Sequence, residues 1–260
     1  MSDSENLYQS PRKDSVDDWA PDSIHATLAF ILPLIVFLVI ASFYPDFTDS
    51  AANGTGVSAQ AKAYVVMIGV QVFVAAGLLT YFHKTHLRHF PLRFSWLSVV
   101  VGVVGIVIWI ALCEAQLEKQ LLTLIGMGDW YPNRPSFNPF AEFNDRTFLA
   151  FFLGIRFFLL AIIVPIVEEL FIRGWLVRWL ENDDWQLVRL TELGLRALAA
   201  ASVYGVLTHP GEALAAIAWF SLVTWLMHRT GNLWDCVIAH AVTNFLLGIY
   251  VIAVGAWHLW

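Results

Sequence analysis

FFLGIRFFLLAIIVPIVEELFIRGWLVRWL, residues 151–180, is a long apolar block of the chain that contains only five charged side chains. A helix crosses the roughly 30 Å hydrocarbon core of a membrane with about 20 apolar residues, because each residue rises about 1.5 Å. The block is therefore long enough to span a membrane. Its charged side chains lie inside the span, where an ionisable group is costly unless it is paired, so they are the first candidates for a functional site.

Six further apolar blocks lie on both sides of this one, at 27–44, 64–82, 96–113, 197–207, 213–227 and 233–257. Hydrophobic residues make up 58% of the 260 residues and charged residues only 14%, whereas about 25% of a soluble domain is charged. The sequence predicts an all-α, polytopic transmembrane helical bundle of seven spans, or eight if a short helix precedes residues 151–180. The net charge of -6 leaves no basic surface, which excludes a nucleic-acid partner.

Lysine and arginine predict the orientation of the bundle, because they stay on the cytoplasmic side of a membrane in short loops. They follow the second block, the 151–180 block and the sixth block. This pattern places the polar N-terminal segment, residues 1–23, in the cytoplasm and predicts a multi-pass protein of the cell inner (plasma) membrane. The loop 114–146 then lies outside. Its aromatic residues among Pro and Asn suit the headgroup level, or a lid.

An acidic pair followed by an arginine lies inside the 151–180 block. On a helix, Glu169 and Arg173 are four residues apart with the acid first, which is the favourable order for an ion pair. Arg173 can neutralise Glu169 and leave Glu168 on a neighbouring face, where a carboxylate in a low dielectric suits a general base. Pro165 would break the helix just before the pair, and such breaks are tolerated where protein or water lines a site. Both acids could instead mark the cytoplasmic boundary of the membrane.

Three more polar side chains lie in the later blocks. His209 follows the 197–207 block, and His240 and Asn244 are four residues apart in the last block, so they share one helix face. An imidazole and a carboxamide that face a cavity can stabilise a developing oxyanion. A single residue of this kind is more often a hydrogen-bonding contact between membrane helices. Their occurrence in successive spans together with Glu168 favours one shared site.

The ordered pattern Glu-Glu-x-x-x-Arg, then His, then His-x-x-x-Asn resembles the CAAX-protease and bacteriocin-processing (CPBP) family of intramembrane endopeptidases. The resemblance covers residues 151–260, and the C-terminal sequence is similar to the bacterial CAAX prenyl protease-related subgroup associated with exosortase systems. The family's usual phenylalanine four residues before the first catalytic histidine is here Gly205, with Tyr204 beside it. The resemblance implies cleavage of a peptide bond near a lipidated or membrane-embedded C-terminal anchor.

The resemblance also implies a role for each polar residue of the pattern. Glu168 and His209 would activate a water molecule, and His240 and Asn244 would stabilise the oxyanion. Glu169 and Arg173 would form a structural ion pair. The implied site residues are Glu168, His209, His240, Asn244, Glu169 and Arg173.

Zinc is the alternative cofactor. Glu168, His209 and His240 could bind a zinc ion with an open position for water. No HExxH motif is present, and Asn244 and Arg173 fit an oxyanion and ion-pair scheme without further ligands. We therefore expect a glutamate-type endopeptidase without a metal.

A second histidine group, His83, His86 and His89, lies after the second apolar block. Lysine and arginine residues are interleaved with it, and their charge disfavours a bound cation. A basic loop against anionic headgroups explains this composition without a metal.

The sequence thus predicts an intramembrane endopeptidase in which residues 24–146 form the first three spans and the outer loop, and residues 147–260 form the catalytic core. Its partners would be a membrane protein or lipopeptide substrate, the lipid bilayer and exosortase-type sorting machinery. The alternative is a noncatalytic membrane immunity factor or an accessory subunit of a protein-sorting complex, which would use the same polar residues for packing. A transporter is least favoured, because the first three spans contain almost no polar residues.

Overall fold

A computed structural model describes residues 23–45, 59–131 and 136–259, and within these residues it contains helices and turns but no strand. The all-α prediction is confirmed for this part of the chain. Most of the predicted N-terminal segment 1–23 lies outside it. Six helical stretches among the described residues are long and apolar enough to cross a membrane: Ile24–Ala41, Ala59–His89, Trp96–Leu124, Arg146–Trp179, Pro210–Thr230 and Leu233–Val254.

The predicted count of seven or eight spans is not confirmed. The predicted block 197–207 forms α9 (Leu195–Thr208), a helix of 14 residues. At about 1.5 Å per residue it is roughly 21 Å long, which is shorter than the roughly 30 Å core of a bilayer. Apolar composition alone therefore did not distinguish a full span from a shorter membrane helix.

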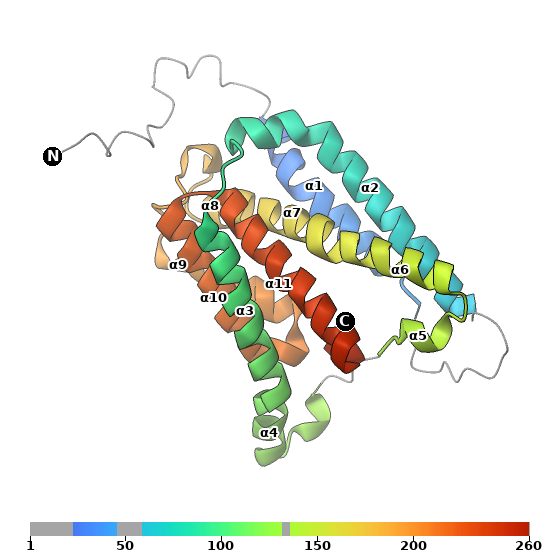
Figure 1. The fold of residues 1–260 in the computed structure, drawn as a ribbon. Helices are drawn as coiled ribbons and strands as arrows, with labels where there is room; N and C mark the ends of the chain where they lie inside the picture. The colour runs from blue at the N-terminus through green and yellow to red at the C-terminus, as the bar shows by residue number, and fades with distance from the viewer. Residues whose placement is uncertain (1–22, 46–58, 132–135, 260) are drawn as a thin grey trace.

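The long helices pack in pairs (Figure 1). α1 (Ser23–Ala41) is antiparallel to α2 (Ala59–His89) and α9 is antiparallel to α10 (Ala213–Thr230), whereas α3 (Trp96–Ala115) and α11 (Leu233–Val254) are parallel. The contact between α3 and α11 depends on glycine, because a Cβ atom at Gly102 would lie 2.7 Å from the carbonyl oxygen of Ala239. Small residues allow membrane helices this close approach.

The span Arg146–Trp179 is not a regular helix. It consists of α6 (Arg146–Phe158), a π-helical turn Leu159–Ile163, α7 (Val164–Glu169), a second π-helical turn Leu170–Leu176, and α8 (Val177–Trp179). In a π-helix each N–H donates to the carbonyl five residues back. The π-turns stand directly before and after α7, so they set which side chains of the acidic pair and of the following turn point into the bundle.

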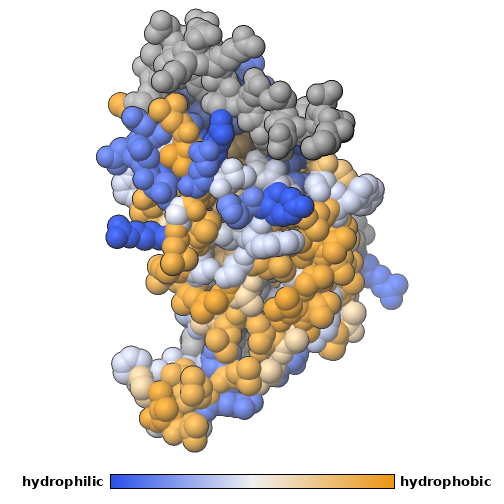
Figure 2. All heavy atoms as spheres, turned by 90° about the vertical axis from the view of Figure 1, so that its left-hand side faces the viewer, coloured by the Kyte–Doolittle hydropathy of each residue, from blue (hydrophilic) through white to orange (hydrophobic). Residues whose placement is uncertain are grey.

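The surface of the bundle is apolar in its middle. Figure 2 shows hydrophobic residues across the centre of one face, with hydrophilic residues gathered near its upper end. The C-terminal ends of α2, α8 and α10, the loops that follow them and the start of α9 carry the arginines and lysines noted in the sequence. These ends lie on one side of the bundle (Figure 1). We call this side the basic side.

The predicted outer loop contains short helices of its own. α4 (Leu117–Leu124), the 3₁₀ turn η2 (Gly128–Trp130) and α5 (Pro139–Glu142) lie between α3 and α6. Two hydrogen bonds attach this segment to the turn that follows α9. The backbone N–H of Leu214 donates to Glu118 Oε1 at 2.8 Å, and the Tyr131 hydroxyl donates to the Gly211 carbonyl at 3.0 Å.

The histidine group lies on a helix, and the expectation of a surface loop was wrong. α2 continues through His89, so the three histidines occupy its last two turns. His86 is buried, and its Nε2 donates to the Ala29 carbonyl at 2.8 Å. The helical periodicity of this segment was obscured in the sequence by its charged residues.

Candidate active site

One cavity, of volume ≈ 570 Å³, is lined by all four residues that the sequence resemblance linked to catalysis. Each comes from a different position in the fold: α7, the C-terminal end of α9, and two successive turns of α11. Segments about 40 and 70 residues apart in the sequence therefore meet at one place. The four residues are Glu168, His209, His240 and Asn244.

Glu169 lies beside this cavity in a fully buried cluster. It forms an ion pair with Arg173, and its Oε1 accepts a hydrogen bond from His240 Nδ1 at 3.0 Å. Arg173 NH2 also donates to the Phe220 carbonyl at 3.2 Å. Glu169 and Arg173 have no exposed surface. Both carboxylate oxygens of Glu169 are engaged, although Arg173 Nε has no hydrogen-bond partner among the described residues. Glu169 is therefore committed to the structure, and it is not among the residues that line the cavity.

Glu168 is arranged differently. Its side chain lines the cavity, and its Oε1 accepts a hydrogen bond from the Tyr204 hydroxyl at 3.3 Å. Its Oε2 lies 3.9 Å from His240 Nε2. This second distance is too long for a direct hydrogen bond, and one water molecule can bridge polar atoms at such a separation. Of the two adjacent acids, Glu168 is the one that faces the cavity.

The contact with Glu169 fixes the orientation of the His240 ring. A carboxylate can only accept, so Nδ1 carries a hydrogen and Nε2 is directed to the cavity side, where Glu168 lies. An acid that holds one imidazole nitrogen also sets which tautomer is present. The ring of Trp219 packs edge-on against His240 with centroids 4.6 Å apart.

The four charged groups of this cluster can balance. When Glu168 and Glu169 are ionised and Arg173 and His240 are protonated, the sum of their charges is zero. A cluster without net charge is much less costly to bury than one with an excess charge.

Asn244 is held by the irregular helix that faces it. Its Nδ2 donates to the carbonyl of Leu160 at 2.9 Å. Val164 N–H bonds to Leu159 as a π-helix requires, but Pro165 has no N–H to offer the next carbonyl, that of Leu160. Asn244 supplies the missing donor. The helix break expected at Pro165 thus fixes the carboxamide on the cavity wall.

His209 caps the C-terminal end of α9. Its Nδ1 is 3.0 Å from the Thr208 hydroxyl, which can donate or accept, and 3.2 Å from the Gly205 carbonyl, which can only accept. When Nδ1 donates to Gly205, Nε2 is the acceptor nitrogen of the ring. The rings of Trp109 and Phe220 contact His209, with centroids 5.2 and 6.4 Å away.

Two residues of this site were not assigned a role from the sequence. Glu212 is buried and lines the cavity three residues after His209; the acid in the Pro-Gly-Glu turn was the available signal. The Tyr204 hydroxyl donates a hydrogen bond to Glu168. The aromatic residue that the family usually has at the position of Gly205 cannot be accommodated in this protein, and Tyr204 stands beside it. A Cβ atom at Gly205 would lie 2.3 Å from Phe220 Cδ2, so no larger side chain fits there.

Zinc was the alternative cofactor, with Glu168, His209 and His240 as its ligands. Among the described residues, no group of three His, Cys, Asp or Glu side chains is arranged to hold a metal ion. One nitrogen of His240 is directed to Glu169, and the alternative ligand set Glu168, His209 and His240 is not among such groups.

The fold and the cavity define a helical protein with candidate membrane spans and a buried glutamate–histidine site. Residues 150–246 match a family model described as type II CAAX prenyl endopeptidase Rce1-like. The matched region runs from α6 into α11 and includes all six residues of the predicted pattern. It supports a likeness to intramembrane CAAX-type proteases. Comparisons with curated proteins and with solved structures found no match.

Proposed function

We propose that this protein is an intramembrane endopeptidase that hydrolyses a peptide bond near the C-terminal anchor or lipidated end of a membrane protein or lipopeptide. One observation carries the proposal. Of two adjacent buried carboxylates, Glu169 is fully engaged by Arg173 and His240, whereas Glu168 faces a cavity together with two imidazoles and a carboxamide. A packing role would bury both acids among helix contacts. A carboxylate on a cavity wall beside hydrogen-bond donors is the arrangement that peptide hydrolysis needs.

Glu168 is the general base. It takes a proton from a water molecule, whose oxygen attacks the carbonyl carbon of the scissile bond. His209 lines the same cavity, and its Nε2 accepts the second hydrogen bond from that water. The Tyr204 hydroxyl holds the Glu168 carboxylate in place. General-base catalysis of this kind contributes about 10²- to 10⁴-fold to a rate.

His240 and Asn244 stabilise the oxyanion that forms when the water oxygen attacks. His240 is oriented by Glu169 and presents Nε2–H in its protonated form. Asn244 uses one N–H for the Leu160 carbonyl and has a second on the same nitrogen. When the tetrahedral intermediate collapses, the C–N bond breaks and Glu168 returns its proton to the leaving amine. The products are a new carboxylate and a free amine.

The surroundings support a substrate that is itself anchored in the membrane. The cavity lies within a bundle whose helices are apolar over membrane-spanning lengths. The helix ends and loops of the basic side carry arginines and a lysine, which supports a multi-pass inner-membrane protein with a cytoplasmic N-terminus. Association with exosortase-type sorting machinery is part of the same proposal and depends on the sequence resemblance alone.

The test compares membrane proteins from cells that contain the protein with those from cells that lack it. Mass spectrometry of their C-terminal peptides should reveal at least one membrane protein or lipopeptide that is shortened only when the protein is present. Purified protein should then cleave a peptide of that sequence in detergent. Identical C-termini in both membranes would contradict the proposal and favour the noncatalytic immunity or accessory role.

Replacing Asn244 by alanine is expected to lower kcat about 10²- to 10³-fold with little change in KM, because it removes one oxyanion donor. It also leaves the Leu160 carbonyl without the donor it has now. Cleavage of the identified peptide by purified protein measures this effect. Asn182→Ala, which changes an exposed asparagine of the loop after α8, is the matched control. A parallel rise in KM at constant kcat would show that Asn244 binds substrate instead.

A further inference from the structure

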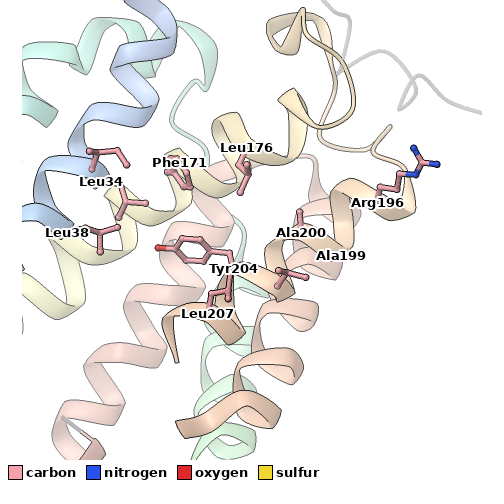
Figure 3. Close-up of a pocket in the computed structure, with 11 residues that line it drawn as sticks. Leu34, Leu38, Phe171, Leu176, Arg196, Ala199, Ala200, Tyr204 and Leu207 are labelled. Carbon is pink, nitrogen blue, oxygen red and sulfur yellow. The ribbon is translucent and has the colours of Figure 1, made fainter. Parts of the chain in front are cut away.

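A second cavity runs along one face of α9 (Figure 3) and shares no lining residue with the catalytic cavity. Its volume is ≈ 510 Å³. Its facing wall is apolar and comes from α1 and from the π-helical turn Leu170–Leu176. We call this cavity the α9 groove. The α9 residues that line it recur at the i, i+3, i+4, i+7, i+8 and i+11 positions and so share a helix face: Arg196, Ala199, Ala200, Val203, Tyr204 and Leu207.

The α9 groove is charged at one end only. Arg196 is its one charged lining residue, and it lies at the beginning of α9, at the opposite end of the row from Tyr204 and Leu207. Along the helix axis, the distance from Arg196 to Leu207 is about 16 Å. The start of α9 adjoins the loop 180–194 on the basic side, so the groove leads from the membrane surface toward its interior. This layout matches an amphiphile with its head at Arg196.

The charged end favours an anion. Arg196 is exposed and has no hydrogen bond or ion pair among the described residues. The nearby acids are engaged elsewhere, since Glu192 pairs with Arg189 and Glu181 accepts a hydrogen bond from Gly194 N–H at 2.7 Å. No side chain caps the N-terminus of α9, whose partial positive charge adds to that of Arg196.

The remainder of the groove suits an alkyl chain and not a peptide. A peptide helix is about 10 Å wide, and an extended peptide in lipid needs hydrogen-bond partners for its backbone. Apart from Arg196, the one polar side chain of the groove is Tyr204, and its hydroxyl already donates to Glu168. An alkyl chain needs no such partner and gains from burial against Ala200, Val203 and Leu207.

We propose that the α9 groove binds one acyl chain of an anionic phospholipid, with the phosphate at Arg196 and the chain directed toward Tyr204. The charge of Arg196 favours a phospholipid as the source of this chain over a lipid group attached to a substrate peptide, because the latter carries no phosphate. The ring of Tyr204 lines the groove while its hydroxyl binds Glu168. A lipid in the α9 groove would thus contact Tyr204, the side chain that is hydrogen-bonded to the proposed base Glu168.

Native mass spectrometry of the full chain tests this proposal in the absence of any substrate. The protein, purified in mild detergent, is mixed with equal amounts of phosphatidylglycerol and phosphatidylcholine that carry the same acyl chains. We expect one retained lipid, with about a fivefold preference for phosphatidylglycerol, the value that one arginine at an anionic surface provides. Arg196→Gln should retain a lipid without the preference. Val203→Trp should fill the groove and retain neither lipid.

Two matched variants serve as controls. Arg229→Gln removes an exposed arginine at the end of α10 that is not part of the groove, and Val100→Trp adds the same bulk on α3 at a valine that is 56% exposed, as Val203 is. Both should behave as the unchanged protein does. Equal retention of the two lipids by the unchanged protein, or undiminished retention by Val203→Trp, would overturn the proposal, as would a co-purified lipid-modified peptide in place of phospholipid. Lipid retention is measured without cleavage, so it stands or falls separately from the proposed protease activity.

Discussion

Replacing Glu168 by glutamine is expected to abolish peptide cleavage while the protein still accumulates in the membrane. Glutamine has nearly the same shape and can accept the hydrogen bond from Tyr204, so the cavity wall is retained. It cannot take a proton from water at neutral pH, so the rate should fall by at least about 10²- to 10⁴-fold. The measurement is the amount of shortened substrate in membranes, together with the rate of peptide cleavage by purified protein.

The control for this variant is Glu192→Gln, which removes an exposed acid that pairs with Arg189. It should cleave substrate at the original rate. Cleavage that persists in Glu168→Gln would remove the proposed base and return the cluster to a packing role. Loss of protein from the membrane in this variant would instead mean that Glu168 is needed for folding, which the purified variant's thermal unfolding would reveal.

Replacing Arg173 by methionine is expected to destabilise the folded protein by about 3–5 kcal/mol, because it leaves Glu169 buried without its ion-pair partner. This is a large part of the roughly 5–15 kcal/mol by which folded proteins are stable. Arg173 also donates to the Phe220 carbonyl, so the contact between this span and α10 is weakened as well. Thermal unfolding in detergent, and the amount of protein in the membrane, measure the effect.

A second change should restore part of this stability. In the double variant Arg173→Met with Glu169→Gln the buried charge is gone, so unfolding should shift back toward that of the unchanged protein. Arg189→Met is the matched control. Its pair with Glu192 is exposed, and exposed pairs contribute only about 0–1 kcal/mol. Equal effects of Arg173→Met and Arg189→Met would contradict the assigned role of the buried pair.

Much of the fold and of the candidate site follows from local sequence signals. The apolar blocks predicted the long helices, because the length needed to cross a membrane can be counted along one continuous segment of sequence. The spacing of Glu169 and Arg173 gave their ion pair, since such neighbours meet on one helix turn whatever surrounds them. The four residues of the cavity were grouped from a pattern in chain order, and the structure places them around one cavity. Their catalytic roles stay predictions.

Other features depend on contacts that no local signal contains. The hydrogen bond between His240 and Glu169 joins two helices far apart in the sequence. The π-helical turns around α7 follow from how Pro165 and its neighbours pack, and a single proline predicted only some break in the helix. The apolar composition of α9 predicted a full membrane span, although the helix has only 14 residues. The α9 groove depends on small residues of one helix facing bulky residues of another, which a single sequence does not reveal.

The shortness of α9 has a consequence for the lipid around it. Lipid that contacts a helix of about 21 Å must thin by roughly 9 Å relative to a typical bilayer, or the helix must be shielded by its neighbours. α10 packs along α9, and α8 and the π-helical turn Leu170–Leu176 contact it as well. We therefore expect a local depression of the bilayer along the part of α9 that these elements leave uncovered, so that headgroups and water approach the level of His209. A protein with such a short membrane helix should partition into thin membranes in preference to thick, sterol-rich ones.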